Sequence, residues 1–408
     1  MLHTKAFWAT LQITGILAGS PATAFAQKIY DAGASDTEIK IGNIGPYSGP
    51  ASAYAAISKT FVAYFKMLNE KGGINGRKVT ILSYDDAYSP PKTVEQARKL
   101  VESDEVLAIA GVVGTPGNSA IQRYMHQRGV PHLFFGSGAS KWADPKNFPW
   151  SMAWLPSYRD EARIYARYIL KNYPGKKVGI LFQNDDFGKD YLVGFNEVFG
   201  SAKSQIVTAE VPFDVSQPSI DPQIVQIKTS NPDVFVNIAT PKFAAQAIKK
   251  IGDLGWRPVH FITNVSVSVS AVLKPAGLEN SQGIMSAAYL KDPNDPQWKD
   301  DAGMNEFRAF MSNFFPEGDA ADALTVSGYS IAETLLQVLK QCGDDLTRKN
   351  VMRQAANLDM VSGVALPGIR FKTSPTDYSP IEQMQLMRFQ GDSWHLFGQL
   401  TSVGAENN

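Results

Sequence analysis

The stretch IKIGNIGPYSGPASAY, residues 39–54, contains a strand and the turn that follows it. Isoleucine at alternate positions is typical of a buried β-strand, and the run Ser48-Gly49-Pro50 favours a turn. A helix is expected next, because apolar residues over 61–68 recur at helical spacing and Gly72-Gly73 provides a stop signal. The stretch therefore predicts that the chain opens with a β-α unit.

The same alternation of strand and helix continues through most of the chain. Further strands are predicted at residues 78–84, 106–113, 130–135, 178–182, 234–238 and 259–262, with helices between them such as 93–103, 119–127, 161–171 and 244–251. A strand near 283–289, two longer helices at 301–314 and 323–341, and a β-hairpin over 384–397 follow. Such alternation predicts parallel sheets covered by helices on both faces. Since 408 residues exceed the roughly 150 of a single such unit, we expect an α/β fold of two doubly wound parallel-sheet lobes.

The composition excludes several classes of function. Lys and Arg total 39 and Asp and Glu total 39, so no basic field attracts phosphates and no nucleic-acid partner is expected. The single cysteine, Cys342, excludes an internal disulfide and a multi-cysteine metal site. The five histidines lack HxxH or HExxH spacing, and the GxGxxG, GKS/GKT and GxSxG motifs are absent. We therefore expect no metal, no cofactor and no enzyme.

Residues 1–26 have the anatomy of a cleaved export signal. Lys5 precedes an apolar run over 6–17, and Ala24-Phe25-Ala26 places small residues before Gln27. The alternative, a buried N-terminal helix, leaves this Ala-x-Ala ending unexplained. No later stretch reaches the roughly 18–20 apolar residues that span a bilayer. We expect a protein exported to the periplasm, not inserted in the membrane and without a lipid anchor, because no cysteine follows the signal.

Three clusters of small residues fall at the carboxyl ends of predicted strands: 48–50, 114–117 and 136–140. Ligands bind at this edge of open α/β sheets. Small residues there expose backbone N–H groups and hydroxyls at helix N-termini, which suits a carboxylate. For any one cluster, glycines that only form a tight turn are the alternative. Three clusters together favour an uncharged site for an anion.

Three segments together resemble the type I periplasmic binding proteins of the leucine/isoleucine/valine-binding family, which are components of ABC importers. They are the stretch quoted above, LNEKGGINGRKVTILSYDDAYSPPKTVEQARKLV at 68–101 and FQNDDFGKDYLVGF at 182–195. The resemblance covers most of the chain after the signal. It implies two lobes, joined by a hinge of three crossing segments, that close on a small ligand. We expect one lobe over 37–156 plus 288–364 and the other over 157–287 plus 365–402.

The resemblance also implies the ligand-binding residues. After the third strand of the first lobe, the implied residue is a hydroxyl residue, Thr115, with Pro116 next to it. After the fourth strand, the implied residues are small: Gly136, Ser137 and Gly138. In the first loop, the implied aromatic residue is Tyr54, with Tyr47 as a near alternative. Aromatics around the cleft include Trp142 and Trp154. In the second lobe the implied residues are Phe187, Thr240 and Asn264.

Two departures from the family bear on the ligand. Family members that bind amino acids carry a glutamate near the place of Asn264, and the family's disulfide falls near Tyr88 and Gly114, where this chain has no cysteine. Burying an ammonium without a carboxylate partner is costly, which makes an amino acid a poorer ligand. We expect a small carboxylate, an aromatic acid of the benzoate or cinnamate type, sandwiched by aromatic residues.

Expected partners are ABC permease subunits with cytoplasmic ATPases, and the protein is expected to act as a monomer. Three alternatives stay open: a branched-chain or other amino acid as ligand, a ligand sensor that reports to a receptor, and a secreted hydrolase of unrecognised type. The fold alone does not separate them, since one fold serves many functions.

Overall fold

The first sheet is wholly parallel and contains five strands in the order β3-β2-β4-β5-β6. The computed structural model describes residues 1–3 and 28–402, so the signal predicted at 1–26 lies, apart from its first three residues, outside the described residues. The strands are β2 (Glu38–Gly45), β3 (Lys78–Asp85), β4 (Ala108–Ala110), β5 (His132–Phe135) and β6 (Ser151–Ala153). Strand β2 lies between β3 and β4, and most of its residues are buried, as expected for a strand inside a parallel sheet.

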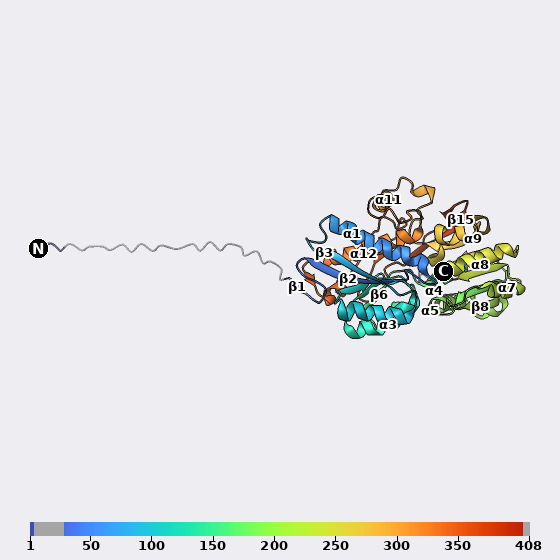
Figure 1. The fold of residues 1–408 in the computed structure, drawn as a ribbon, viewed down its shortest axis with the longest axis horizontal. Coiled ribbons are helices and arrows are strands. Elements are labelled where there is room, and N and C mark those ends of the chain that lie inside the picture. The colour runs from blue at the N-terminus through green and yellow to red at the C-terminus, as the bar shows by residue number, and fades with distance from the viewer. Residues whose placement is uncertain (4–27, 403–408) are drawn as a thin grey trace.

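Helices cover both faces of this sheet (Figure 1). One face carries α1 (Ala55–Glu70), α11 (Ala302–Phe314) and α12 (Ala323–Cys342), and the other carries α2 (Pro90–Arg98) and α3 (Thr115–Arg128). Tyr64 of α1 contacts Phe310 and Tyr329, with ring centroids 5.8 and 5.1 Å away. The two late helices therefore pack with the N-terminal sheet, far from their neighbours in sequence.

The second sheet has eight strands in the order β16-β15-β11-β10-β9-β7-β8, with β17 paired to β15. They are β7 (Val178–Gln183), β8 (Val207–Phe213), β9 (Val234–Ile238), β10 (Val259–Ile262), β11 (Met285–Ala288), β15 (Gln383–Gln390), β16 (Ser393–Leu396) and β17 (Thr401–Ser402). Strands β7 to β11 are parallel, whereas β15 is antiparallel to β11 and forms the predicted hairpin with β16. The parallel architecture is confirmed, and the second sheet is mixed at this one edge.

Four longer helices flank the second sheet. Helices α4 (Tyr158–Asn172) and α5 (Asp186–Phe199) pack together on one face, and α7 (Asp221–Thr229) and α8 (Pro241–Asp253) pack on the other. Short helices lie between them: α6 (Lys203–Ile206), α9 (Lys274–Ala276) and α10 (Leu278–Ser281). Strand β8 was absent from the sequence prediction, because at this edge Thr208 and Pro212 are exposed and the strand lacks a continuous apolar run.

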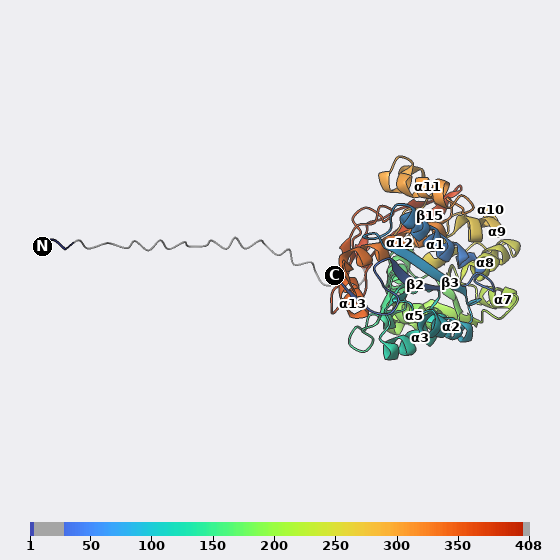
Figure 2. The ribbon, with the colours of Figure 1, turned by 60° about the vertical axis from the view of Figure 1, so that its left-hand side comes forward.

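The chain passes between the two sheets three times: after β6, after β11, and after β14 (Phe371–Lys372), which pairs with β13 (Asp359–Met360). Helix α13 (Arg348–Ala355) follows the small ladder of β1 (Ile29–Tyr30) with β12 (Asp345–Leu346). In Figure 1 α1 and α12 lie to the left, with the first sheet, and α7 and α8 lie at the right, with the second, whereas the turned view of Figure 2 brings α1 and α8 next to each other in projection. The exact lobe limits stay a prediction.

Candidate functional site

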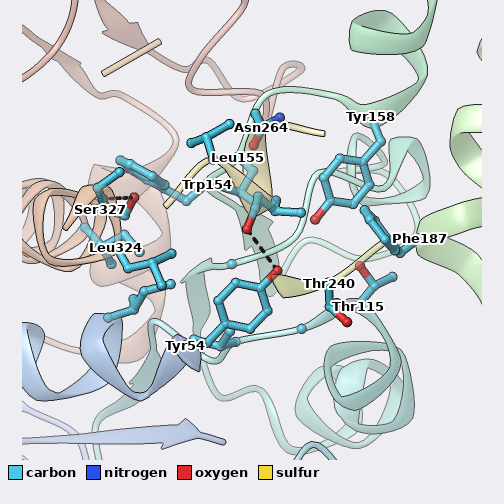
Figure 3. A pocket seen from close by; sticks show the side chains of 18 of the residues that line it. Tyr54, Thr115, Trp154, Leu155, Tyr158, Phe187, Thr240, Asn264, Leu324 and Ser327 are labelled. Carbon is cyan, nitrogen blue, oxygen red and sulfur yellow. Dashed lines mark hydrogen bonds between the residues drawn. The ribbon is translucent and has the colours of Figure 1, made fainter. Parts of the chain in front are cut away.

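A cavity with an empty volume of about 630 Å³ lies between the two lobes (Figure 3). Six aromatic side chains dominate its lining: Tyr54, Tyr88, Trp154, Tyr158, Phe187 and Tyr289. Its polar side chains are neutral: Thr115, Thr240, Asn264 and Ser327. None of the described residues that line it carries a charge at neutral pH. An apolar, aromatic lining with a few neutral polar groups is typical of a site for a small molecule.

The N-terminus of α3 supplies hydrogen-bond donors from the first lobe. Thr115 Oγ1 lies 2.7 Å from Ser137 Oγ, which accepts the indole N–H of Trp142 at 2.8 Å. Since Ser137 already accepts that proton, its own hydroxyl can donate to Thr115, which leaves the Thr115 proton free for a ligand. The N–H groups in the first turn of α3 add partial positive charge at the same place. We call this end of the cavity, formed by Thr115 and the first turn of α3, the donor end.

The second lobe contributes residues that follow three of its strands. Phe187 lies in the first turn of α5, where Asp185 accepts its backbone N–H at 3.0 Å. Thr240 follows β9 and donates to Gln183 Oε1 at 3.1 Å. Asn264 follows β10 and is 8% exposed. The carboxyl edges of both sheets therefore face one cavity.

Edge-to-face contacts hold the aromatic walls in place. The ring centroids of Tyr158 and Phe187 are 5.0 Å apart, and those of Trp154 and Tyr289 are 5.6 Å apart. The Trp154 indole is fully buried and donates to Thr334 Oγ1 at 3.2 Å. Rings fixed in this way form flat, rigid walls that suit a planar ligand.

The ring of Tyr88 packs directly against Gly114. These are the two positions near which the resemblance places a disulfide, and this chain has no cysteine at either. Gly114 has a φ of 104°, and a Cβ built there would lie 2.4 Å from Tyr88 Cε2. Burial raises the pKa of Tyr88 and of Tyr54 well above the ordinary 10. Both hydroxyls therefore stay protonated at neutral pH. The ring of Tyr88 and the backbone of Gly114 together form part of the cavity wall.

A buried carboxylate, Glu161 of α4, lies directly behind Asn264. It accepts hydrogen bonds from the backbone N–H of Asn264 at 2.8 Å and from the Asn264 side-chain amide. The hydroxyls of Tyr165 and Tyr191 also donate to it, at 2.5 and 2.7 Å. Burial raises the pKa of Glu161 to about 7, and these four donors oppose that rise. The sequence offered no sign of this group near the ligand.

The lobes also contact each other directly. The Tyr54 hydroxyl donates to the backbone oxygen of Val265 at 3.1 Å, which joins the residue before α1 to the segment after β10. Lys141 Nζ lies 2.5 Å from the Asp186 carboxylate, and Ser140 Oγ donates to Asp190 at 2.5 Å. The described conformation is therefore closed.

Removal of the Tyr54 hydroxyl is expected to weaken ligand binding. Tyr54→Phe loses the bond to Val265 that exists only when the lobes are closed, and such a bond contributes about 1 kcal/mol. The ligand Kd should rise about fivefold, since closure then stabilises the complex less. Tyr47→Phe is the matched control, because the Tyr47 hydroxyl bonds to Ser83 within the first lobe. Equal Kd values for both variants in calorimetric titration would contradict the role of Tyr54.

Glu161 should also produce a measurable pH dependence of stability. Its folded pKa of about 7 exceeds the ordinary 4.5, so its stabilising contribution is complete below pH 4.5 and is lost as the pH rises through 7. Relative to Glu161→Gln, the wild type should lose about 1–3 kcal/mol of unfolding free energy between pH 4.5 and pH 7.

Urea denaturation of both proteins at the two pH values measures this difference. The buried His132 and His260, whose pKa values burial lowers to about 3, affect both proteins alike and cancel in the comparison. A gap between the two proteins that does not change with pH would contradict the prediction.

The structure brings seven of the eleven predicted site residues to the cavity: Tyr54, Thr115, Gly136, Trp154, Phe187, Thr240 and Asn264. Four others do not line it: Tyr47, Pro116, Ser137 and Gly138. The Tyr47 hydroxyl lies on Ser83, and Ser137 is buried behind Thr115. Pro116 lies within the first turn of α3, and the Gly138 carbonyl accepts the N–H of Tyr158 at 2.8 Å. Trp142 likewise holds Ser137 from behind instead of lining the cavity.

Several residues of the site were absent from the sequence prediction. Tyr158 and Tyr289 lie where the chain crosses between the sheets, and Ser327 comes from α12. These two tyrosines could have been predicted from their place at the crossings, since segments that join two lobes border the cleft between them. Ser327 and Glu161 carry no local signal, because each lies on an ordinary helix.

Neither a metal site nor a membrane span occurs in the part of the chain that the structure describes. Residues 28–402 contain no group of three or more His, Cys, Asp or Glu side chains that could hold an ion. No helix in this range is long and apolar enough to cross a membrane.

Comparison with known proteins agrees with this architecture. A family model described as periplasmic binding protein matches residues 38–393. A Leu/Ile/Val-binding protein homolog of Brucella melitensis is 23% identical over 331 residues, which cover 78% of this chain and 83% of the relative.

Two solved structures share the fold at low identity. A branched chain amino acid ABC transporter protein from Thermus thermophilus with bound valine has a TM-score of 0.80 at 14% identity and covers 91% of this chain and 98% of its own. A solute binding protein of an ABC transporter from Rhodopseudomonas palustris, in complex with 3,4-dihydroxybenzoic acid, has a TM-score of 0.75 at 18% identity, with 91% and 99% covered. With two α/β lobes closed on one cavity and a family match across most of its length, this chain belongs to the periplasmic binding protein family, whose members bind solutes.

Proposed function

We propose that this protein is the periplasmic solute-binding component of an ABC importer and that it captures a small aromatic acid of the benzoate or cinnamate type. The observation that carries the proposal is the cavity lining, with six aromatic rings, neutral polar groups and no charged side chain. Aromatic walls attract a planar ring by offset or edge contacts. An uncharged lining excludes ligands that need a full counter-charge in contact with them.

The donor end supports a carboxylate as the anionic group. Thr115 can donate its hydroxyl proton to a ligand when Ser137 donates to Thr115, and the first turn of α3 adds N–H groups with partial positive charge. Neutral dipoles of this kind hold a carboxylate without a cationic side chain. They also release it more readily than a buried ion pair would, which suits a transport protein.

Asn264 supports an acid without an ammonium group. An ammonium has three N–H donors, and the carboxylate that lies behind Asn264, Glu161, already accepts four hydrogen bonds. A carboxylate ligand that lacks an amine leaves no charge unmatched at this place.

Capture follows from closure of the lobes. The ligand contacts one lobe first and adds contacts to the other as they close, so its preference for the closed form shifts the equilibrium. In the proposed function the closed form then docks weakly on permease subunits, and the predicted signal at 1–26 directs export.

A branched-chain amino acid is the second candidate. It is favoured by the curated relatives named for leucine, isoleucine and valine and by the structural neighbour with bound valine. The neighbour with bound 3,4-dihydroxybenzoic acid is equally consistent with the first candidate. The two candidates differ in whether the ligand carries an ammonium.

Calorimetric titration with benzoate, 4-hydroxybenzoate and leucine separates the two candidates. We expect micromolar binding of at least one aryl acid and no heat from leucine. Thr115→Val should weaken aryl acid binding about tenfold, since it removes the donor and keeps the shape. Micromolar binding of leucine without any response to the aryl acids would reject the proposal.

A further inference from the structure

The amide of Asn264 is turned so that it presents an acceptor to the cavity. Both of its donors, the backbone N–H and the side-chain Nδ2, point to the Glu161 carboxylate. Its Oδ1 is buried and has no hydrogen-bond partner among the described residues, and Asn264 is one of the residues that line the cavity. A buried carbonyl oxygen without a partner is costly, so this atom is available for a ligand donor.

The orientation of the amide is imposed by Glu161. In its ionised form the Glu161 carboxylate only accepts, so rotation of the amide would then place two acceptors against each other. Glu161 is itself fully buried and held by the hydroxyls of Tyr165 and Tyr191. A network in which each donor has an acceptor stays fixed in one arrangement. Glu161 therefore acts on a ligand through Asn264 and does not line the cavity.

The cavity thus has two chemically different ends. Thr115 and the start of α3 offer donors, whereas Asn264 offers one neutral acceptor. Thr115 and Asn264 lie on opposite sides of the ring-lined space (Figure 3). A single neutral acceptor matches a group with one donor, such as a hydroxyl, and would leave two N–H groups of an ammonium without partners there.

We propose that the ligand is a hydroxylated aromatic acid whose hydroxyl donates to Asn264 Oδ1, and that Glu161 is the positioning residue that keeps this oxygen turned to the ligand. This inference rests on the proposed function and narrows it to a class of substrate. Sites built to bond a hydroxyl discriminate strongly against analogues that lack it, because their buried polar atom is then left unpaired.

The test compares ligands of equal size with and without the donor. Calorimetric titration uses 4-hydroxybenzoate and 3-hydroxybenzoate, each against the methylbenzoate with a methyl at the same position, and leucine as the ammonium probe. For the wild type, the better hydroxybenzoate should bind at least tenfold more tightly than its methyl partner. Equal affinities would overturn this inference and leave the proposed function standing. Binding of leucine alone would overturn both.

Two variants test the positioning role. In Glu161→Gln the preference for hydroxyl over methyl should fall to about threefold or less, and in Asn264→Ala it should disappear. Glu333→Gln is the matched control, because Glu333 is a second poorly exposed glutamate that bonds to Ser362 away from the cavity, and it should keep the wild-type ratio. A ratio unchanged in Glu161→Gln would remove Glu161 from the account, and a ratio unchanged in Asn264→Ala would overturn the whole inference.

Discussion

Replacement of Gly114 by alanine is expected to lower the free energy of unfolding by about 3 kcal/mol and to weaken ligand binding about a hundredfold. The φ of 104° at this position disfavours any residue with a Cβ, and that Cβ would lie 2.4 Å from the ring of Tyr88. Tyr88 cannot stay where it is, so the cavity wall and the start of α3 must both shift. Urea denaturation measures the stability and calorimetric titration with the preferred aryl acid measures the Kd.

Gly72 provides the matched control. Its φ of 98° is similar, and a Cβ there would meet nothing within 4 Å. Gly72→Ala should therefore cost only the backbone strain, about 1 kcal/mol, with no change in Kd. Adding Tyr88→Ala to Gly114→Ala should recover part of the lost stability, since the clash is gone. Equal effects of the two alanine variants would show that the ring contact is unimportant.

Trp154→Ala is expected to cost about 3–5 kcal/mol of unfolding free energy and to abolish measurable aryl acid binding. The indole is fully buried, contacts the rings of Tyr289 and Phe371 edge-on, and bonds to Thr334. Its removal creates a void at the crossing between the sheets and takes away one wall of the cavity. The first loss appears in denaturation and the second in titration at a temperature where the variant is folded.

Trp394 separates these two effects. It is also buried, packs edge-on against Phe389, and donates to the backbone of Val267, but it does not line the ligand cavity. Trp394→Ala should be similarly destabilised and still bind the aryl acid within about threefold of wild type. Normal binding by Trp154→Ala would contradict a wall role for this residue.

Most strands that are buried on both faces could be predicted, although the three-residue strand β6, which is also buried, was not. Parallel strands covered by helices are continuous apolar runs, as in Val234–Ile238, and helices between them follow a different period. Strand β8 was not predicted, because Thr208 and Pro212 of this edge strand are exposed and its sequence has no continuous apolar run. The antiparallel placement of β15 beside β11 depends on how the chain returns to the second sheet, which no local pattern records.

Several of the predicted residues that line the cavity lie at strand ends. Thr115, Thr240 and Asn264 all follow parallel strands, and the carboxyl edge of such a sheet is where ligands bind. Side-chain direction was less predictable. Tyr47 lies in the right loop, yet its hydroxyl turns to Ser83.

Glu161 illustrates the limit of local reasoning. An acidic residue in the first turn of a helix is what the helix dipole favours, so it appears as ordinary surface chemistry in the sequence. Only the packing of α4 against the loop after β10 brings this carboxylate to Asn264. The carboxylate that bonds to Asn264 therefore comes from another element, α4, and lies behind the cavity lining.

Identification of the small molecule that leaves the purified protein on denaturation tests the central claim most directly. Mass spectrometry of that fraction should reveal a carboxylic acid with an aromatic ring, in an amount close to one per protein chain. Leucine, isoleucine or valine in the same stoichiometry would contradict the account.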